Sequence, residues 1–519
     1  MADLSGFSTV GPSQSPNQSG QPWYRLLTRY HWFVLVVAAL GWLFDCLDQQ
    51  LFVMARPAVM ADFFPVPANA TPAENAAIRQ RQSDGGNIST SIFMAGWALG
   101  GIVFGVLGDR IGRARTMVIT ILMYSLFTGL SSFAVGLWDF AFYRFLTGLG
   151  VGGEFAVGVA LVAEVMPAAA RPYCLGLLQA LSAVGNISAA LINLGLGIAD
   201  EGGLPASPWR IMFLIGAIPA LLALVIRRNL QEPEVWQRQQ ALNASQPTPF
   251  FSQYQELFST PKLRKHAILG LILGCAGIIG LWSVGFFTMD LIKSVARPVE
   301  RQALYGQAVS AARASSDQSQ LARLDQLIKL GAAERDTLDA TTLSPELRAE
   351  YQTIARQLDK RLIALQSYTG IALNVGAFFG MFGFGALSQI IGRKPTFALA
   401  FIAAFISTVV VFLYLQDFWQ IWVLVPIMGF CQLSLFAGYA IYFPELFPTR
   451  LRSTGTSFCY NVGRFIAASG PLVKLYLEWL FKDSTEPLRY AGATMCFVFI
   501  IGLLALPFLP ETKGRPLPE

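Results

Sequence analysis

Two aspartates interrupt an apolar stretch near the start of the chain. Asp45 and Asp48 stand three residues apart in the stretch GWLFDCLD, so a helix would place them on one face, about one turn apart. If this stretch spans a membrane, each charge costs about 2.5–3.5 kcal/mol, and such residues usually face a pathway or a partner. Burial and mutual repulsion favour the protonated form of one carboxyl group, so the pair could bind and release a proton. The alternative is a structural hydrogen bond made by one aspartate.

Three further charged residues lie in apolar stretches. Glu154 is a second candidate for proton binding, with a structural hydrogen bond as the alternative. Arg144 precedes a glycine-rich run that would permit tight packing against the helix of the aspartates, so it could pair with Asp45 or Asp48 or contact a substrate. Arg464 is interpreted as a clamp for the carboxylate of an anionic substrate, because an anion in a low-dielectric cavity needs a cationic partner.

Neutral polar side chains could complete a binding site. Gln179, Asn186 and Asn193 recur every seven residues and so fall on one side of a helix, where they could bind a ligand or hold helices together. In the second half of the chain, the candidates are Asn374, Gln432, Tyr439, Tyr442, Tyr460 and Asn461.

The composition indicates which elements must position these residues. Hydrophobic residues make up 54% of the 519 residues and charged residues 13%, and the mean hydropathy is +0.49, which excludes a soluble globular protein. A bilayer is spanned by about 20 apolar residues in a helix. The sequence therefore predicts an all-α membrane protein with twelve spanning helices, which begin near residues 32, 87, 116, 140, 173, 211, 267, 367, 396, 418, 454 and 490.

Short motifs recur about 280 residues apart along the chain. Gly112-Arg113 recurs as Gly392-Arg393, and the pattern ExxPxxxR at 164–171 recurs at 445–452. Each copy lies between long apolar stretches. The chain is therefore interpreted as two pseudo-symmetric six-helix bundles, a construction found in many transporters.

The basic residues predict the orientation. They gather in the short connections that follow the even-numbered helices, which places these connections and both termini in the cytoplasm. The predicted parts are a disordered cytoplasmic tail at 1–30, an N-terminal bundle at 31–228, a cytoplasmic linker at 229–265, a C-terminal bundle at 266–509 and a cytoplasmic tail at 510–519.

A polar insert at residues 293–366 interrupts the second bundle between its first two helices. It falls on the outward side, and its basic residues do not contradict this because long segments translocate largely regardless of charge. Apolar residues at 321, 324, 327, 328 and 330 form an amphipathic pattern that predicts a helical cap or hairpin, with a disordered loop as the alternative. The shorter outward connection at 62–86 is expected to contain a helical turn at 71–82.

The connection between the second and third helices has the pattern GxxxDRxGRxR, which starts at Gly105 and includes Asp109, Arg110 and Arg113. This pattern closely resembles the signature loop of the major facilitator superfamily. The resemblance implies alternating access, with a cytoplasmic charge latch that opens as the two bundles rock. The alternative is that these arginines only set the orientation. The second copy lacks the Asp-Arg pair, so we expect a weaker latch there. The residues interpreted as gating latches are Asp109, Arg110, Arg113, Glu164, Arg171, Arg393, Glu445 and Arg452.

Other motifs indicate the branch of this family. The stretch RFLTGLGVGGE at 144–154 is similar to the fourth helix of metabolite:proton symporters for organic and aromatic acids, and the acidic pair on the first helix also resembles such proteins, although Cys46 stands where a glycine is common. Glu232-Pro233 and the stretch PETKGR at 510–515 resemble the closing motifs of sugar porters. The resemblance covers nearly the whole chain except the insert and the N-terminal tail.

Three functions follow as hypotheses. Proton-coupled symport of a small organic anion, such as a monocarboxylate or an aromatic or sugar acid, is favoured over an uncoupled facilitator for a neutral sugar or polyol and over a non-transporting receptor. The six cysteines contain no CxxC pair, and phosphate-loop and hydrolase motifs are missing, so we expect no enzyme, cofactor or metal. The expected partners are the anion, protons and the lipid bilayer, without nucleic acid. We expect a monomer in the cell (inner) membrane.

Overall fold

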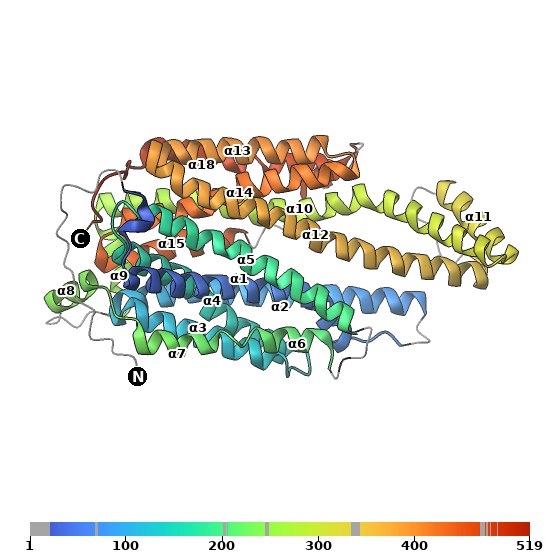
Figure 1. Cartoon of the computed structure of the whole chain (residues 1–519), viewed down its shortest axis with the longest axis horizontal. Helices are drawn as coiled ribbons and strands as arrows, with labels where there is room; N and C mark the ends of the chain where they lie inside the picture. The colour runs from blue at the N-terminus through green and yellow to red at the C-terminus, as the bar shows by residue number, and fades with distance from the viewer. Residues whose placement is uncertain are drawn as a thin grey trace.

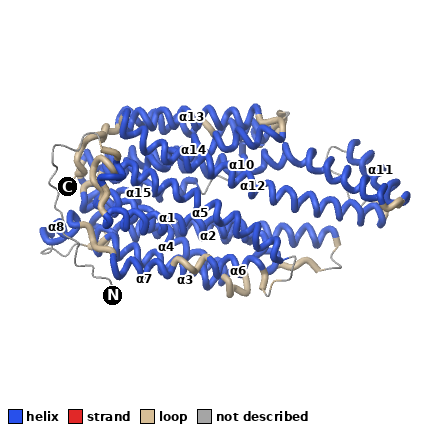
Figure 2. The backbone as a smooth tube through the Cα atoms, viewed as in Figure 1, coloured by secondary structure: helices blue, strands red, loops and turns tan. Residues whose placement is uncertain are grey.

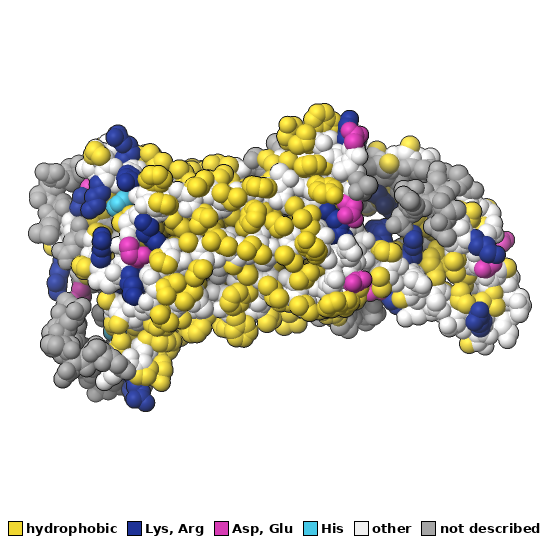
Figure 3. Space-filling model, turned by 90° about the horizontal axis from the view of Figure 1, so that it is seen from above, with side chains coloured by type: hydrophobic (Ala, Val, Ile, Leu, Met, Phe, Trp, Pro, Cys, Tyr) yellow, Lys and Arg dark blue, Asp and Glu magenta, His cyan; other side chains and the backbone are white. Residues whose placement is uncertain are grey.

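The computed structural model describes residues 21–518, apart from residues 68–70, 201–203, 205, 244–248, 334–342, 468–472, 474–475, 478 and 485. All regular elements in this part of the chain are helices, with no strand (Figure 2). Ten of the described helices are long and apolar enough to cross a membrane. Hydrophobic side chains cover the middle of the face shown in Figure 3, and charged side chains lie towards its two ends. The chain is a multi-pass membrane protein.

The N-terminal bundle contains six spans. They are α1 (Arg29–Phe63), α2 (Pro72–Ile111), α3 (Arg113–Ser131), α4 (Leu137–Val165), α5 (Arg171–Asp200) and a broken sixth span made of α6 (Pro208–Ile215) and α7 (Ala220–Asn229). The sixth span breaks because Pro219 has no N–H group for the helical hydrogen-bond ladder. The turn expected at 71–82 is the start of α2 itself, since Thr71 and Glu74 form a capping box that begins the helix there.

The C-terminal bundle repeats this arrangement. Its spans are the first part of α10 (Pro261–Ala314), α12 (Pro345–Ile391), α13 (Arg393–Tyr414), α14 (Ile421–Leu446), α15 (Arg452–Ala467) and a broken last span made of α17 (Pro487–Met495) and α18 (Val498–Ala505). Besides the ten long apolar helices, the spans are the broken sixth one and the eleventh, of which α15 is the described part. The predicted fold of twelve spans in two six-helix bundles is confirmed.

The remaining short helices lie in the connections. They are η1 (Trp23–Leu26), α8 (Glu234–Asn243), α9 (Ser252–Ser259), η2 (Phe418–Gln420), η3 (Thr449–Leu451) and η4 (Leu506–Phe508). Of the predicted disordered tail, residues 1–20 lie outside the described residues. The rest differs from that prediction, because Trp23 in η1 stacks on Tyr173 with ring centres 5.5 Å apart, which holds this segment on the bundle.

The insert is helical over its described residues. The helix α10 continues without a break beyond the bundle, α11 (Gln318–Ala333) follows, and α12 returns to the membrane part (Figure 1). Buried leucines, among them Leu324 and Leu358, pack these helices together. An ion pair of 3.2 Å between Arg361 and Glu300 joins α12 to α10. The insert therefore prolongs the first two spans of the C-terminal bundle as a packed helical projection.

The two halves meet mainly along two pairs of helices. The helix α5 packs on α12, and α2 packs on α15. A Cβ atom on Gly176 of α5 would lie only 3.2 Å from the Cα atom of Gly385 in α12, so the small residues permit this close approach. Helices α8 and α9 lie at one end of the molecule, named the linker end here, and α11 lies at the opposite insert end (Figure 1).

Candidate functional site

The Asp48 carboxylate is held inside the N-terminal bundle. Its Oδ1 atom accepts a 2.6 Å hydrogen bond from Thr128 Oγ1 and lies 3.7 Å from Arg144 Nη1. Arg144 also donates to Ser131 Oγ at 2.7 Å, and its guanidinium carbon lies 4.7 Å from the ring centre of Phe213. All five side chains are fully buried. The pair of Asp48 and Arg144 thus ties α1 to α3 and α4.

The glycine-rich run of α4 packs in a direction that the sequence did not predict. Gly148 and Gly152 are four residues apart, share one face and approach the backbone of α2, while Gly150 approaches the backbone of α3. The predicted packing of this run against α1 is therefore wrong. The first helix meets α4 through Gly41, whose missing side chain leaves room for the Glu154 carboxylate.

Asp45 and Glu154 each keep one oxygen unpaired, as Asp48 does at Oδ2. Asp45 Oδ2 accepts a 3.1 Å hydrogen bond from Gln49 Nε2, and Glu154 Oε2 accepts one of 2.6 Å from Thr120 Oγ1. Their second oxygens are buried and have no hydrogen-bond partner among the described residues. The charges of Glu154, Asp48 and Arg464 all act on Asp45. A buried, unpaired carboxylate oxygen is costly unless the group is protonated or gains a partner.

Arg464 is enclosed by aromatic rings where the two halves meet. Its guanidinium carbon lies 3.8 Å from the ring centre of Trp97 in α2 and 4.2 Å from that of Tyr460 in α15. Its Nη1 atom donates to Asn461 Oδ1 at 2.7 Å, and its Nε atom has no partner among the described residues. Tyr460 in turn stacks on Phe155 of α4 with ring centres 3.7 Å apart.

These residues form one cluster, named the central site, which consists of Asp45, Trp97, Glu154, Phe155, Tyr460 and Arg464. Sequence reasoning missed Trp97 and Phe155, because aromatic residues in apolar helices are usually packing residues. The available signal was the set of glycines beside Trp97 in the stretch AGWALGG, which marks a helix face where other backbones come close. The cluster combines two acids, one arginine and flat apolar faces.

Four predicted amides lie along the boundary between the halves or are buried near it. Asn186 Nδ2 donates to Asn374 Oδ1 at 2.9 Å, which joins α5 to α12. Asn461 Nδ2 donates to the carbonyl oxygen of Gly152 at 3.0 Å, which joins α15 to α4. Gln179 is buried, and its Oε1 atom has no partner in the described part of the chain.

Other predicted residues direct their polar atoms elsewhere in the C-terminal half. Gln432 donates to Thr408 in α13 at 2.5 Å. The Tyr439 hydroxyl donates to the backbone of α10 at 2.8 Å, and the Tyr442 hydroxyl donates to a carbonyl of the C-terminal segment at 2.5 Å. The structure therefore does not bring the polar groups of these three residues to the central site.

Four predicted gating residues form a buried cluster at the linker end. Asp109 accepts hydrogen bonds of 3.1 and 2.8 Å from two backbone N–H groups at the start of α15, and it lies 3.0 Å from Arg113. Arg113 and Arg452 both reach Glu164 Oε1, at 3.0 and 2.7 Å. Arg452 belongs to the C-terminal half and the other three to the N-terminal half. This linker-end latch therefore joins the halves.

The remaining gating candidates have other partners. Arg393 binds Glu445 through two hydrogen bonds of 2.9 and 3.2 Å, and both residues belong to the C-terminal half. Arg171 donates to a backbone oxygen at the end of α4 at 3.3 Å. Arg110 donates to Gln253 of α9 at 3.3 Å, so it holds the linker on the N-terminal bundle.

Two glutamates of the closing motifs cap helices, a role that the sequence reasoning did not assign. Glu232 accepts hydrogen bonds of 3.1 and 3.0 Å from N–H groups in the first turn of α3, and Glu511 accepts two of 3.0 Å in α13. Each helix follows a glycine with positive φ, 111° at Gly112 and 104° at Gly392. Burial alone would raise the pKa of Glu511, but bonds from four backbone N–H groups outweigh it and hold that pKa below its ordinary value.

Known proteins match both halves of the chain. The family Sugar (and other) transporter matches residues 36–273, and the family Major Facilitator Superfamily matches residues 345–519. A Haemophilus influenzae protein assigned to metabolite transport is 29% identical over 94% of this chain and 98% of its own length. A Cupriavidus pinatubonensis protein assigned to 4-methylmuconolactone transport is 28% identical over 91% and 89%. The cis,cis-muconate transport protein of Acinetobacter baylyi is 26% identical over 82% and 85%.

Solved structures share the fold. A proton:xylose symporter bound to 6-bromo-6-deoxy-D-glucose superposes with a TM-score of 0.63, at 16% identity, over 94% of this chain and 98% of that one. The human organic anion transporter MFSD10 gives a TM-score of 0.58, at 13% identity, over 92% and 100%. Family matches in both halves, transporter relatives along almost the whole chain and the shared fold together identify the chain as a transporter, not an enzyme, that belongs to the major facilitator superfamily.

Proposed function

We propose that this transporter couples proton movement to the uptake of a small organic anion, with a planar or aromatic carboxylate as the substrate class. The observation that carries the proposal is the buried Asp45 carboxylate, which has an unpaired oxygen and lies under the influence of the Arg464 charge. When an acid and an arginine share one buried site, protonation of the acid removes its negative charge and leaves the arginine available to an anion. The muconate transport protein and a benzoate transport protein among the relatives support this substrate class.

The aromatic rings around Arg464 support a flat substrate. A guanidinium group binds a carboxylate through parallel hydrogen bonds, and its unpaired Nε atom is available for one of them. The rings of Trp97 and Tyr460 already cover its faces, so a planar acid could stack on the same aromatic surface. A substrate with a conjugated ring or chain next to its carboxylate would contact both the arginine and the aromatic rings.

Proton coupling follows because Asp45 and the substrate carboxylate compete for the positive charge of Arg464. When Asp45 is ionised, its negative charge satisfies Arg464 and opposes a second anion nearby. When Asp45 is protonated, Arg464 is free to bind the substrate carboxylate. Glu154 acts on Asp45 through its own charge, so we propose that the two acids hold one proton between them. Substrate then loads together with a proton and leaves when the proton is lost to the more alkaline side.

We assign a positioning role to the pair of Asp48 and Arg144. Its contacts with Thr128 and Ser131 lie within the N-terminal half, and aromatic rings surround the guanidinium group. This pair fixes α1 against α3 and α4 and so orients Asp45, which lies one turn away on the same helix. The substrate contact therefore belongs to Arg464 in this proposal.

Alternating access uses the linker-end latch. We place the linker end in the cytoplasm because its short connections are rich in arginine. With the latch formed, Arg452 is bound to Glu164 across the two halves, which holds the cytoplasmic side shut. Rocking of the halves must break this contact before the substrate can leave the central site.

Uptake into proteoliposomes tests the proposal. Benzoate, nicotinate and cis,cis-muconate serve as labelled probes, with an inside-alkaline gradient of one pH unit. One proton per substrate supports about tenfold accumulation in that gradient. Asp45→Asn should abolish this accumulation but keep counterflow exchange, while Arg464→Gln should abolish both. Asp62→Asn is the matched control, because Asp62 lies on the same helix but is partly exposed at the insert end.

The outcomes separate the parts of the proposal. Full gradient-driven accumulation by the double variant Asp45→Asn/Glu154→Gln would refute proton coupling through the central site. Unchanged binding by Arg464→Gln would refute the carboxylate clamp.

The second candidate is an uncoupled facilitator for a neutral sugar. The match of residues 36–273 to the Sugar (and other) transporter family favours it. Counterflow of labelled glucose or xylose that does not depend on pH, without flux of the three acids, would select this function.

A further inference from the structure

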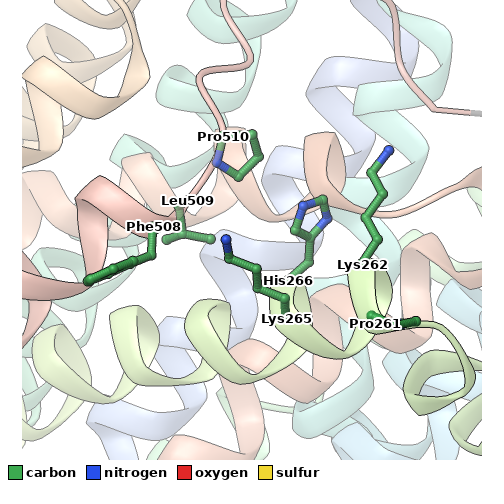
Figure 4. A pocket seen from close by; sticks show the side chains of 7 residues that line it. All are labelled: Pro261, Lys262, Lys265, His266, Phe508, Leu509 and Pro510. Atoms are coloured by element: carbon green, nitrogen blue, oxygen red, sulfur yellow. The ribbon is translucent and has the colours of Figure 1, made fainter.

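A hollow of about 450 Å³ opens at the linker end of the C-terminal half. The first turns of α10 form one wall, and η4 with the residues after it forms the other (Figure 4). The lining residues are Pro261, Lys262, Lys265, His266, Phe508, Leu509 and Pro510. None of them belongs to the central site or to the linker-end latch.

The polar side of the hollow is positive. Lys262 and Lys265 are exposed, no acidic residue lines the hollow, and no ion pair is found for either lysine among the described residues. The His266 ring between them is fixed by a 3.1 Å hydrogen bond to the carbonyl oxygen of Leu446. Glu511 follows the hollow in sequence, but its carboxylate is engaged by the first turn of α13. Two ammonium groups thus line the hollow without a counter-charge from the described part of the chain.

The opposite side of the hollow is apolar and continues along the bundle. Phe508 is 63% exposed at its edge. Exposed apolar side chains continue from it along α18 at Leu504 and Ile501, three to four residues apart, which places them on one helix face. A ligand that fills the hollow and follows this face needs an anionic head and an apolar body.

We propose that this hollow binds the phosphate group of an anionic phospholipid, with Lys262 and Lys265 as the phosphate contacts and the acyl chains along the exposed face of α18. Basic pockets beside membrane helices are suited to phospholipid head groups, because the lysines lie at the depth of the phosphates. Free phosphate has the same head-group chemistry but would gain nothing from the apolar face. The experiment therefore compares both sources.

The test uses the purified full-length chain and measures its affinity for phosphatidylglycerol, phosphatidylcholine and inorganic phosphate, for example by native mass spectrometry with titrated lipid. We expect phosphatidylglycerol to bind at one preferred site. Each lysine near a lipid head group contributes a factor of about five, so Lys262→Gln/Lys265→Gln should lower the affinity roughly thirtyfold. Lys262→Arg/Lys265→Arg keeps the charge and should keep most of the affinity, which also shows that changes at these positions permit folding.

Arg264→Gln provides the matched control. Arg264 lies between the two lysines in sequence and is exposed, but it does not line the hollow. If Arg264→Gln weakens binding as much as the lysine changes, the attraction is a general effect of the basic end and the proposed site is wrong. Phosphatidylcholine binding equal to that of phosphatidylglycerol, or inorganic phosphate binding as tightly as the lipid, would also overturn the assignment.

Discussion

Replacement of Glu164 by glutamine should open the linker end of the transporter. The Glu164 carboxylate is the shared partner of two buried arginines, Arg113 in its own half and Arg452 in the other half. Glutamine keeps the shape of the side chain but removes the negative charge. The closed arrangement then contains two buried arginines with less compensation, whereas separation of the halves exposes Arg452 to water.

The magnitude follows from the ion pair between Glu164 and Arg452, which crosses between the halves. Removal of one partner from a buried ion pair costs about 3–5 kcal/mol. Arg113 keeps its 3.0 Å contact with Asp109 in both arrangements, and the substitution leaves its hydrogen bond to the Thr449 carbonyl oxygen unchanged, so the effect of the substitution on the equilibrium comes from the loss at Arg452. At about 3 kcal/mol, and 1.4 kcal/mol per factor of ten, the ratio of closed to open linker end should fall roughly a hundredfold.

Distances between spin labels can measure this shift. Labels at Arg115 and Arg264, which are exposed on the two halves at the linker end, should report longer distances in Glu164→Gln than in the unchanged chain. Glu445→Gln is the matched control. Glu445 makes an equally short arginine contact at the equivalent position of the repeat, but its partner Arg393 belongs to the same half. This control should lower stability with a much smaller change in the distance distribution, because Arg171 of the other half is affected by the charge of Glu445 without forming an ion pair with it among the described residues.

An unchanged distance distribution in Glu164→Gln, with a loss of stability equal to that of Glu445→Gln, would refute the reasoning. The buried contact would then be structural, and the energy that holds the linker end shut would have to come from the hydrogen bonds of Asp109.

Three further predictions concern stability, each measured by thermal unfolding of the purified chain. Asp48→Asn leaves the buried Arg144 without its ion-pair partner and should cost about 3–5 kcal/mol, whereas Asp45→Asn should cost much less because Asp45 makes no ion pair among the described residues; equal losses would contradict the positioning role of Asp48. Gly112→Ala should cost at least about 1–2 kcal/mol because φ is 111° there and the added methyl group would meet the Glu232 carboxylate, and no loss would contradict the strained turn. Glu511→Gln should lower the melting temperature at pH 7, and the difference should shrink as the pH falls from the ordinary glutamate pKa of about 4.3 through the lowered pKa of the folded state, since a group with a lowered pKa stabilises the fold only while it is ionised; a difference that does not shrink as the pH is lowered would contradict this.

Most of the fold could be predicted from the sequence because its signals are local. Apolar segment length locates the spans, and the repeated Gly-Arg turns mark the two halves. The predictions failed where a contact with another residue decides the local structure. The second span began earlier than expected because Thr71 and Glu74 cap a helix within a polar stretch. Residues 1–30 were expected to form a disordered tail, yet Trp23 stacks on Tyr173, a contact that no local pattern indicates.

The candidate site was predictable in its charges but not in its pairing. A buried charge is visible in a sequence because it interrupts an apolar stretch, and this identified Asp45, Asp48, Arg144 and Arg464. Which acid meets which arginine depends on helix rotation, which the glycine-rich run of α4 did not reveal. The aromatic residues around Arg464 were not predicted for a different reason. A tryptophan in an apolar helix looks the same in the sequence whether it packs against other helices or binds a ligand.

The difference between the two aspartates is the central physical argument for coupling. They stand one turn apart on α1, yet Asp48 has Thr128 and Arg144 as partners within one rigid half, so its environment need not change when the halves rock. Among the described residues, Asp45 has Gln49 of its own helix as its one hydrogen-bond partner, while the charge of Arg464 reaches it from the other half. Separation of the halves therefore changes the electrostatic environment of Asp45 and leaves that of Asp48 the same. A proton whose binding depends on the relative position of the halves can drive transport, and only Asp45 of this pair meets that condition.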